Sequence, residues 1–362
     1  SDTFPIEPSD TAFSLNARCY ERALETFPRV ARAIAADELR PARQHTAGRR
    51  VFTRHERVAG AGLVDAGRTA AEMERACRAS DVGPQRRWHF GALRLVLDDD
   101  IFLVDACRAE PGAAGPPGSV AIAGDLRIAT ADGTLVVTRL VDTDGTPVAS
   151  EALAGRELLA DGGVLPALAP ELAAHLDRLD PDLSRSEERA VARLEASRTA
   201  ASARLPASGP ASARNVDAVR PTASASLVDG CDPSSVVSVI AAWLAFRTGT
   251  TKASFELVTP PMVGDLRALA PLVMPPTVTL DVAVDASVTD LRAAVDAERD
   301  LAERDGLWLR DLIAREPTLR ADPPPRPDAR ITVAAGGDVT GHVADHGGAR
   351  LHVVVADDRI EL

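Results

Sequence analysis

Aromatic residues and lysine are scarce in this sequence. Aromatic side chains make up 3% of its 362 residues, and Lys252 is the single lysine among 41 basic residues, the rest being arginine. A core with so few rings must be built from Val, Leu, Ile and Ala. Because alanine is also abundant, the arginine excess indicates a compositional bias of the source genome rather than an arginine-based binding surface.

Cysteines, long apolar runs and positive charge are also in short supply. The four cysteines are scattered without a C-x-x-C pair, so no disulfide framework is predicted. No run of 18 apolar residues occurs, so no membrane span is expected, and the first residues do not resemble a signal peptide. A net charge of -12 repels phosphate backbones and argues against nucleic-acid partners. We therefore expect a globular protein located in the cytoplasm.

Several catalytic and ligand-binding motifs are missing. The sequence contains neither G-x-S-x-G nor a Gly-rich phosphate loop, so a nucleophile elbow and a nucleotide site are not predicted. His342, His346 and His352 cluster near the C-terminus, but the surrounding glycines indicate a loop between strands. We expect neither a metal site nor a bound cofactor.

The first half of the chain predicts an N-terminal lobe over residues 1–180. Apolar spacing indicates a helix over 10–38, and a capping box formed by Thr69 and Glu72 begins a second one. Short apolar runs separated by turns between residues 87 and 152 indicate β-hairpins, and a helix is expected near 166–178. Residues 181–225 are interpreted as a crossover, because 196–225 are rich in Ala, Ser, Pro and Arg.

The second half predicts a C-terminal lobe over residues 226–362. Asp232, Pro233 and Gly249 are typical of a helix start and end, and this helix is expected to be buried through Val236, Ile240 and Trp243 among others. Strands are expected at 253–258, 277–284, 330–334 and 351–356, with a helix after Thr289. This alternation indicates a mixed sheet covered by helices.

The same stretch resembles the C-terminal lobe of the condensation domains of nonribosomal peptide synthetases. The resemblance rests on the helix at 234–249, the strand that ends at Pro260-Pro261, a Val263-Gly264 loop, the strand at 276–282, the helix at 287–304 and the segment Leu307–Ile313. It implies an α/β fold of the chloramphenicol-acetyltransferase type. In that fold two lobes each contain a mixed sheet with helices.

The family's signature is H-H-x-x-x-D-G, and its counterpart here is Arg156-Glu-Leu-Leu-Ala-Asp-Gly162. The resemblance places Glu157 at the position of the catalytic histidine and gives Arg156, Asp161 and Gly162 a structural part in the loop. Both histidines are absent, so the motif is degenerate. A turn before a helix is an equally good interpretation of Asp161-Gly162.

Three functions stay open at this point. The resemblance implies a condensation-like domain in natural-product assembly that binds a carrier protein or a neighbouring synthetase domain. The alternative is an active acyltransferase that uses Glu157 or another base on thioesters tethered to carrier phosphopantetheine. A third possibility is an unrelated two-domain binding protein.

Overall fold

The computed structural model describes residues 3–40, 47–51, 58–84, 91–98, 100–112, 115–159, 163–200, 224–227, 231–269, 271–283, 285–334, 351–356 and 359–361. The chain divides into two compact units. Unit 1 contains Ser1–Leu97, Phe102–Val141 and Pro147–Pro181, and unit 2 contains Asp98–Ile101, Asp142–Thr146 and Asp182–Leu362.

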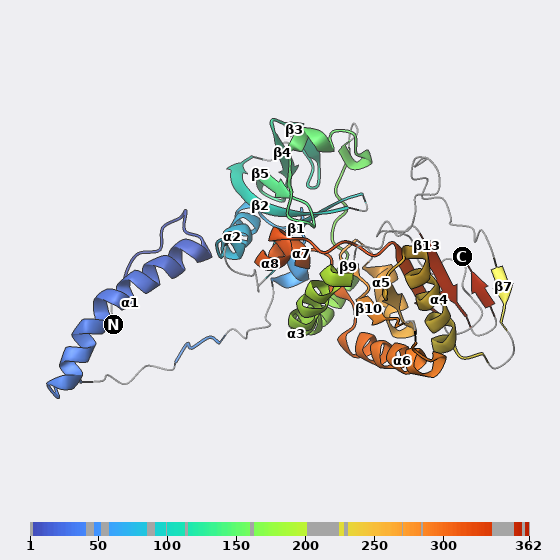
Figure 1. The fold of residues 1–362 in the computed structure, drawn as a ribbon. Helices are drawn as coiled ribbons and strands as arrows, with labels where there is room; N and C mark the ends of the chain where they lie inside the picture. Colours follow the sequence, from blue (N-terminus) through green and yellow to red (C-terminus); the bar gives the residue numbers. More distant parts are fainter. Residues whose placement is uncertain are drawn as a thin grey trace. The chain divides into compact units, whose positions relative to one another are not determined.

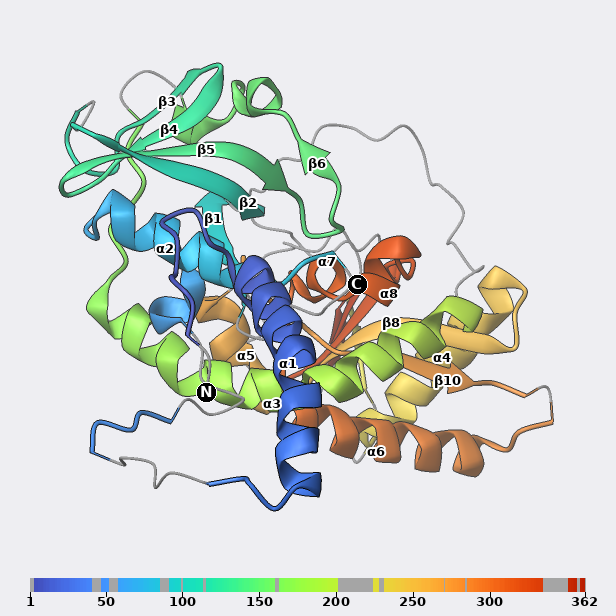
Figure 2. The same ribbon diagram turned by 90° about the vertical axis from the view of Figure 1, so that its left-hand side faces the viewer.

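Unit 1 is built around one sheet, seen in Figure 2 with the strands β2 to β6 labelled. The elements of this part of the chain are α1 (Ala12–Ala35), η1 (Ala59–Gly62), α2 (Ala70–Ser80), β1 (Leu93–Leu97), β2 (Asp100–Pro111), β3 (Val120–Ala123), β4 (Asp125–Ala129), β5 (Gly133–Val141), β6 (Pro147–Val148), η2 (Ser150–Leu153), η3 (Glu157–Leu159) and the beginning of α3 (Pro170–Ala200).

The strand order in this sheet is β1-β2-β5-β4-β3, and β6 pairs with β5. The pairs β2–β5, β5–β4, β4–β3 and β5–β6 are antiparallel. The sequence resemblance implies a mixed sheet in this lobe, but each of these four pairs is antiparallel. Short turns join β3 to β4, β4 to β5 and β5 to β6, and such turns can connect only antiparallel neighbours.

The core of unit 1 lies between this sheet and α2. The capping box of Thr69 and Glu72 is formed as predicted, and it starts a helix that buries Met73 and Cys77. These side chains pack with the aliphatic residues of the strands, of which Leu126 is fully buried. The core is therefore aliphatic, as the shortage of aromatic residues requires.

Unit 2 contains the second half of α3 and a second sheet (Figure 1). Its further elements are β7 (Ser224–Ser226), α4 (Pro233–Thr248), β8 (Lys252–Val258), α5 (Pro260–Ala268), β9 (Val273–Met274), β10 (Thr277–Asp281), α6 (Val288–Asp305), β11 (Trp308–Leu309), α7 (Leu312–Arg315), α8 (Pro317–Ala321), β12 (Ala329–Val333), β13 (Leu351–Val355) and β14 (Arg359–Glu361).

The sheet of unit 2 is mixed, as the sequence predicts. Its strand order is β10-β8-β12-β13-β14-β7. β12 runs parallel to β8 and β13, whereas the pairs β10–β8, β13–β14 and β14–β7 are antiparallel. α4 packs against α6 and β8, and α6 also contacts β10, which Figure 1 shows as neighbouring helices beside the sheet.

The helix α4 begins and ends where the sequence places it. The Asp232 carboxylate accepts a hydrogen bond from the Ser235 amide at 3.2 Å, and Gly249 ends the helix with a φ of 67°. Val236 is buried and Ile240 half-buried, but Trp243, expected on the buried face, is 45% exposed. Val239 and Phe246 of the same helix are exposed as well.

Two further segments differ from the sequence-based expectation. Residues 182–200, assigned to the crossover, continue α3, and Ala190, Val191 and Leu194 pack with Trp308 and Leu312 in unit 2. Val263 and Gly264, expected in a loop, lie in the helix α5. In the described part of the chain, no helix combines the length and the apolarity that crossing a bilayer requires.

Candidate functional site

The segment that carries the degenerate motif begins at Arg156, shortly after η2, and belongs to unit 1. Leu158 and Leu159 pack against the core of the unit, and Leu165 is buried with its amide donating to the carbonyl of Gly118 at 2.8 Å. This packing turns the first residue of the short helix η3 outward. The side chain of Glu157 is therefore exposed.

Arg156 has a well-defined structural place. Its Nη1 donates a hydrogen bond to the carbonyl of Leu97 at 3.3 Å, and its guanidinium lies 4.9 Å from the centre of the Phe102 ring. An arginine stacked on a ring gains a cation–π attraction of about 0.5–2 kcal/mol. Arg156 thus ties the motif segment to the strands β1 and β2.

Asp161 and Gly162, the other two residues of the motif, lie outside the described residues. Their roles therefore stay predictions. The same holds for His342 and His346, whereas His352 lies on β13. Its Nε2 is 3.2 Å from the Thr332 hydroxyl on the neighbouring strand β12, which is a packing contact within the sheet. The described residues contain no group of three His, Cys, Asp or Glu side chains that could hold a metal ion.

Unit 2 contains a pocket that sequence reasoning did not identify. Its cavity volume is about 20 Å³, enough for a bound water molecule. Charged side chains contribute to a mostly apolar wall, which is formed by Leu194, Glu256, Met274, Thr277, Arg310, Ile313 and residues 324–327. The pocket is therefore far smaller than the cavities of about 300–1,000 Å³ that hold small-molecule ligands.

A network of buried charges surrounds this pocket. Glu256 accepts a hydrogen bond from Arg330 Nε at 2.7 Å and forms an ion pair with Arg330 Nη2 at 2.6 Å, across the parallel pair β8–β12. Arg310 is 9% exposed, and burial lowers its pKa to about 10, although the nearby Glu256 carboxylate opposes this change. The guanidinium stays charged at neutral pH, so it can attract a carboxylate.

One signal in the sequence could have indicated these residues. Glu256 is the single charged residue between Ala253 and Val258. Arg330 is the single charged residue between Ala329 and Ala334. A charged residue inside a buried strand needs a partner of opposite charge. The pairing itself, across 74 residues of sequence, is visible only in the structure.

A second buried network stabilises unit 2. Arg315 is fully buried, and its Nε lies 3.1 Å from Asp311 while its Nη2 pairs with Glu187 of α3. Burial alone would lower the pKa of Arg315, but the two carboxylates raise it above its ordinary value. Glu187, which lies in the segment interpreted as a crossover, is therefore buried in an ion pair.

Comparisons with known proteins give limited information. No protein-family model matches the chain, and no curated protein matches it. Among solved structures, the complex of the X-domain and OxyB from teicoplanin biosynthesis matches at 17% identity with a TM-score of 0.31, over 63% of this chain and 60% of that one.

The cyclization-docking bidomain of the EpoB synthetase from Sorangium cellulosum matches at 14% identity with a TM-score of 0.30, over 64% of this chain and 54% of that one. The chain thus spans less than two thirds of either structure. At these scores neither likeness establishes a common fold.

Proposed function

We propose that the chain is a condensation-like domain of the chloramphenicol-acetyltransferase type that acts in the assembly of nonribosomal peptides or related natural products. The support comes from the order of elements between Asp232 and Ile313. α4, β8, β10, α6 and the segment Leu307–Ile313 follow one another in the order that the sequence resemblance gives, with the helix α5 in place of the expected Val263-Gly264 loop.

Its role is to bind a carrier protein or a neighbouring synthetase domain rather than to form the amide bond. The observation that carries this choice is the exposure of Glu157. A carboxylate that acts as a base on tethered substrates works best in a site closed to water, and Glu157 lies open to solvent. The arginine beside it contacts Phe102 and Leu97 and serves the packing of unit 1.

A condensation assay separates binding from catalysis. Donor and acceptor thioesters are loaded on carrier proteins, and product formation is compared between the wild type, Glu157→Gln and Glu151→Gln. Glu151 is a matched control, because it is also an exposed glutamate in the short helix η2 of the same segment. We expect no turnover in any of the three, with carrier binding by biolayer interferometry retained.

Turnover by the wild type that falls at least about 100-fold in Glu157→Gln but not in Glu151→Gln would establish the acyltransferase alternative instead. In that case the substrates are thioesters on carrier phosphopantetheine, and Glu157 acts as the base. Absence of both turnover and carrier binding, with a panel of synthetase domains also failing to bind, would reject the proposed function.

A further inference from the structure

The helix α1 presents an apolar seam along its whole length. Among its 24 residues, no side chain is buried. Apolar residues recur at alternating intervals of three and four, and every one of them is exposed: Phe13, Ala17, Tyr20, Leu24, Phe27, Ala31 and Ile34. This is the heptad pattern of a helix that packs against another helix, with Ala17, Leu24 and Ala31 at the a positions.

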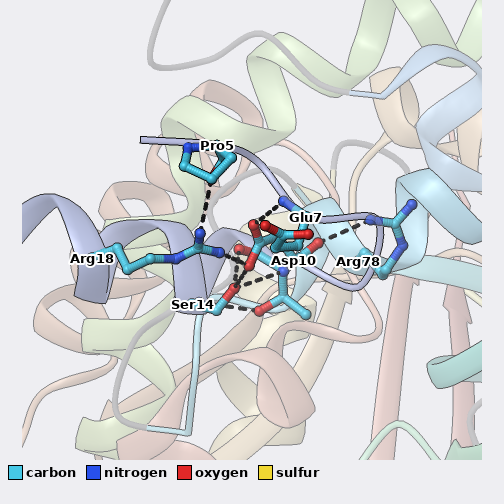
Figure 3. A network of polar contacts seen from close by, with 7 residues as sticks. Pro5, Glu7, Asp10, Ser14, Arg18 and Arg78 are labelled. Carbon is cyan, nitrogen blue, oxygen red and sulfur yellow. Dashed lines mark hydrogen bonds and ion pairs between the residues drawn. The ribbon is translucent and has the colours of Figure 1, made fainter. Parts of the chain in front are cut away.

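The first turn of α1 is attached to α2, which fixes where the seam begins. Figure 3 shows Asp10 at the centre of this attachment. Its carboxylate accepts hydrogen bonds from the Glu7 amide at 2.6 Å and from the Ser14 hydroxyl at 2.8 Å, and it pairs with Arg18. Its carbonyl accepts a hydrogen bond from Arg78 of α2 at 2.9 Å.

The ionised form of Asp10 stabilises this attachment. Burial raises the pKa of Asp10, but the hydrogen bonds from Glu7, Ser14 and Arg18 together outweigh burial, so the pKa lies below its ordinary value. The Phe13 amide adds a hydrogen bond to the carbonyl of Asp81 at 2.7 Å. α1 is thus anchored at its N-terminal end, and the apolar side chains of the seam further along the helix are exposed.

The exposed apolar surface of the seam is large enough for a stable interface. Phe13, Tyr20, Leu24, Phe27 and Ile34 are between 49% and 75% exposed. Together they present on the order of 700 Å², close to the surface of about 800 Å² that each partner buries in a standard protein interface. A monomer seldom exposes a continuous apolar patch of this size.

From the arrangement of side-chain sizes, we infer that α1 pairs with α1 of a second copy of this chain, in antiparallel orientation. Antiparallel coiled coils place an a residue opposite a d residue. With the pair centred on residue 22, Phe13 lies opposite Ala31 of the second copy, and Phe27 lies opposite Ala17. Each ring then faces a methyl group, so the seam is complementary to itself.

The centre and the flanks of the seam fit the same arrangement. Tyr20 and Leu24 form the central layers, each opposite the other in the second copy. Of the six charged residues in α1, only Glu21 borders the seam, and the four arginines and Glu25 lie on the outer positions b and f. Pro28 lies beside the seam at an e position, and the helix continues past it to Ala35.

Charge favours a second copy over a lipid surface. A helix that lies on a membrane usually carries a strongly basic polar face. A negative charge on the rest of the protein repels the anionic lipids of the membrane. The polar face of α1 mixes arginine with glutamate, and the whole chain has a net charge of -12. Both features weaken attraction to an anionic bilayer.

The mass of the full chain in solution tests the pairing. We expect light scattering at about 50 μM to give twice the chain mass of 38.0 kDa for the wild type and for the outer-face control Arg29→Ala, and the single mass for Leu24→Glu. Leu24 is 75% exposed, so its replacement should leave the urea unfolding midpoint unchanged when both proteins are diluted until they are monomeric. A monomeric wild type, or a dimer that persists in Leu24→Glu, would overturn the inference.

The orientation is tested by disulfide trapping on a Cys19→Ser background. Ala17→Cys and Phe27→Cys proteins are mixed and oxidised with copper phenanthroline. We expect the mixed disulfide between positions 17 and 27, identified by mass spectrometry. A disulfide between two copies of position 17 would show parallel pairing and contradict the inference. Monomeric protein that binds phosphatidylserine-containing vesicles, and loses this binding in Leu24→Glu, would make a membrane the partner instead.

Discussion

At the scale of single residues, Arg315 shows how an ion pair without solvent contact can position helices. Its guanidinium joins Asp311, four residues earlier, to Glu187 on α3, 128 residues away in sequence. All three side chains are almost completely buried. Such a group contributes little net stability compared with apolar packing, but removing one partner is costly because the remaining charges stay buried.

We therefore predict that Arg315→Met destabilises the protein by about 3–5 kcal/mol at pH 7, measured by urea unfolding. The variant leaves two carboxylates close together without a cation. In the folded variant the pKa values of these two carboxylates would be raised above their values in the unfolded chain. As the pH falls to about 5, the folded variant therefore binds more protons than the unfolded chain does. The difference in unfolding free energy between the variant and the wild type becomes smaller as a result.

Arg185→Met is the control for this prediction. Arg185 pairs with Asp182 on the same helix, but both side chains are more than half exposed. Exposed ion pairs contribute at most about 1 kcal/mol, so this variant should unfold close to the wild type at both pH values. An equal effect of the two substitutions would show that burial of the Arg315 network has no special importance.

At the scale of elements, two glycines with different backbone conformations allow a matched comparison. Gly249 ends α4 with a φ of 67°, whereas Gly264 lies inside the helix α5. An added Cβ would meet no atom within 4 Å at either position. A difference between the two alanine variants would therefore come from the backbone alone.

We expect Gly249→Ala to lower the free energy of unfolding by about 1 kcal/mol, because an L-residue is strained in the left-handed region. Gly264→Ala should raise it by about 0.5–1 kcal/mol, since alanine restricts the unfolded chain and fits a helix interior. Denaturant unfolding of both variants measures the two changes. Effects of the same sign would contradict the assignment of Gly249 as the end of α4 or of Gly264 as helical.

At the scale of the whole molecule, each unit has a hydrophobic core of its own. Leu126 on β4 belongs to the core of unit 1, and Leu319 on α8 belongs to a cluster in unit 2. Both side chains are fully buried. Replacing either by alanine creates a cavity that costs about 2–5 kcal/mol.

We predict that each of these variants loosens mainly its own unit. Hydrogen exchange followed by mass spectrometry should show faster exchange in β4 and β5 for Leu126→Ala, and in α7, α8 and β12 for Leu319→Ala. The wild-type rates elsewhere in the chain are the internal control. Equal acceleration everywhere in both variants would mean that the chain opens as one cooperative block.

The features that could be predicted from the sequence are local ones. The capping box at Thr69, the start of α4 at Asp232 and its end at Gly249 all lie where the residue types place them, because capping depends on neighbours within four residues. The hairpin strands of unit 1 follow from turn residues and short apolar runs. For the candidate site, the sequence identified the segment 156–162 by its resemblance to the condensation-domain signature. The exposure of Glu157 could not be predicted from it.

Tertiary structure alone decided which charged and apolar side chains are covered. Glu187 looks like a surface residue in sequence and is buried against Arg315, while Trp243 looks like a core residue and is 45% exposed. The helix α3 extends through residues predicted as crossover because Val191 and Leu194 find partners more than 100 residues away. Periodicity marks the apolar face of a helix, but burial is determined by the surface that packs against it, and long-range contacts supply that surface.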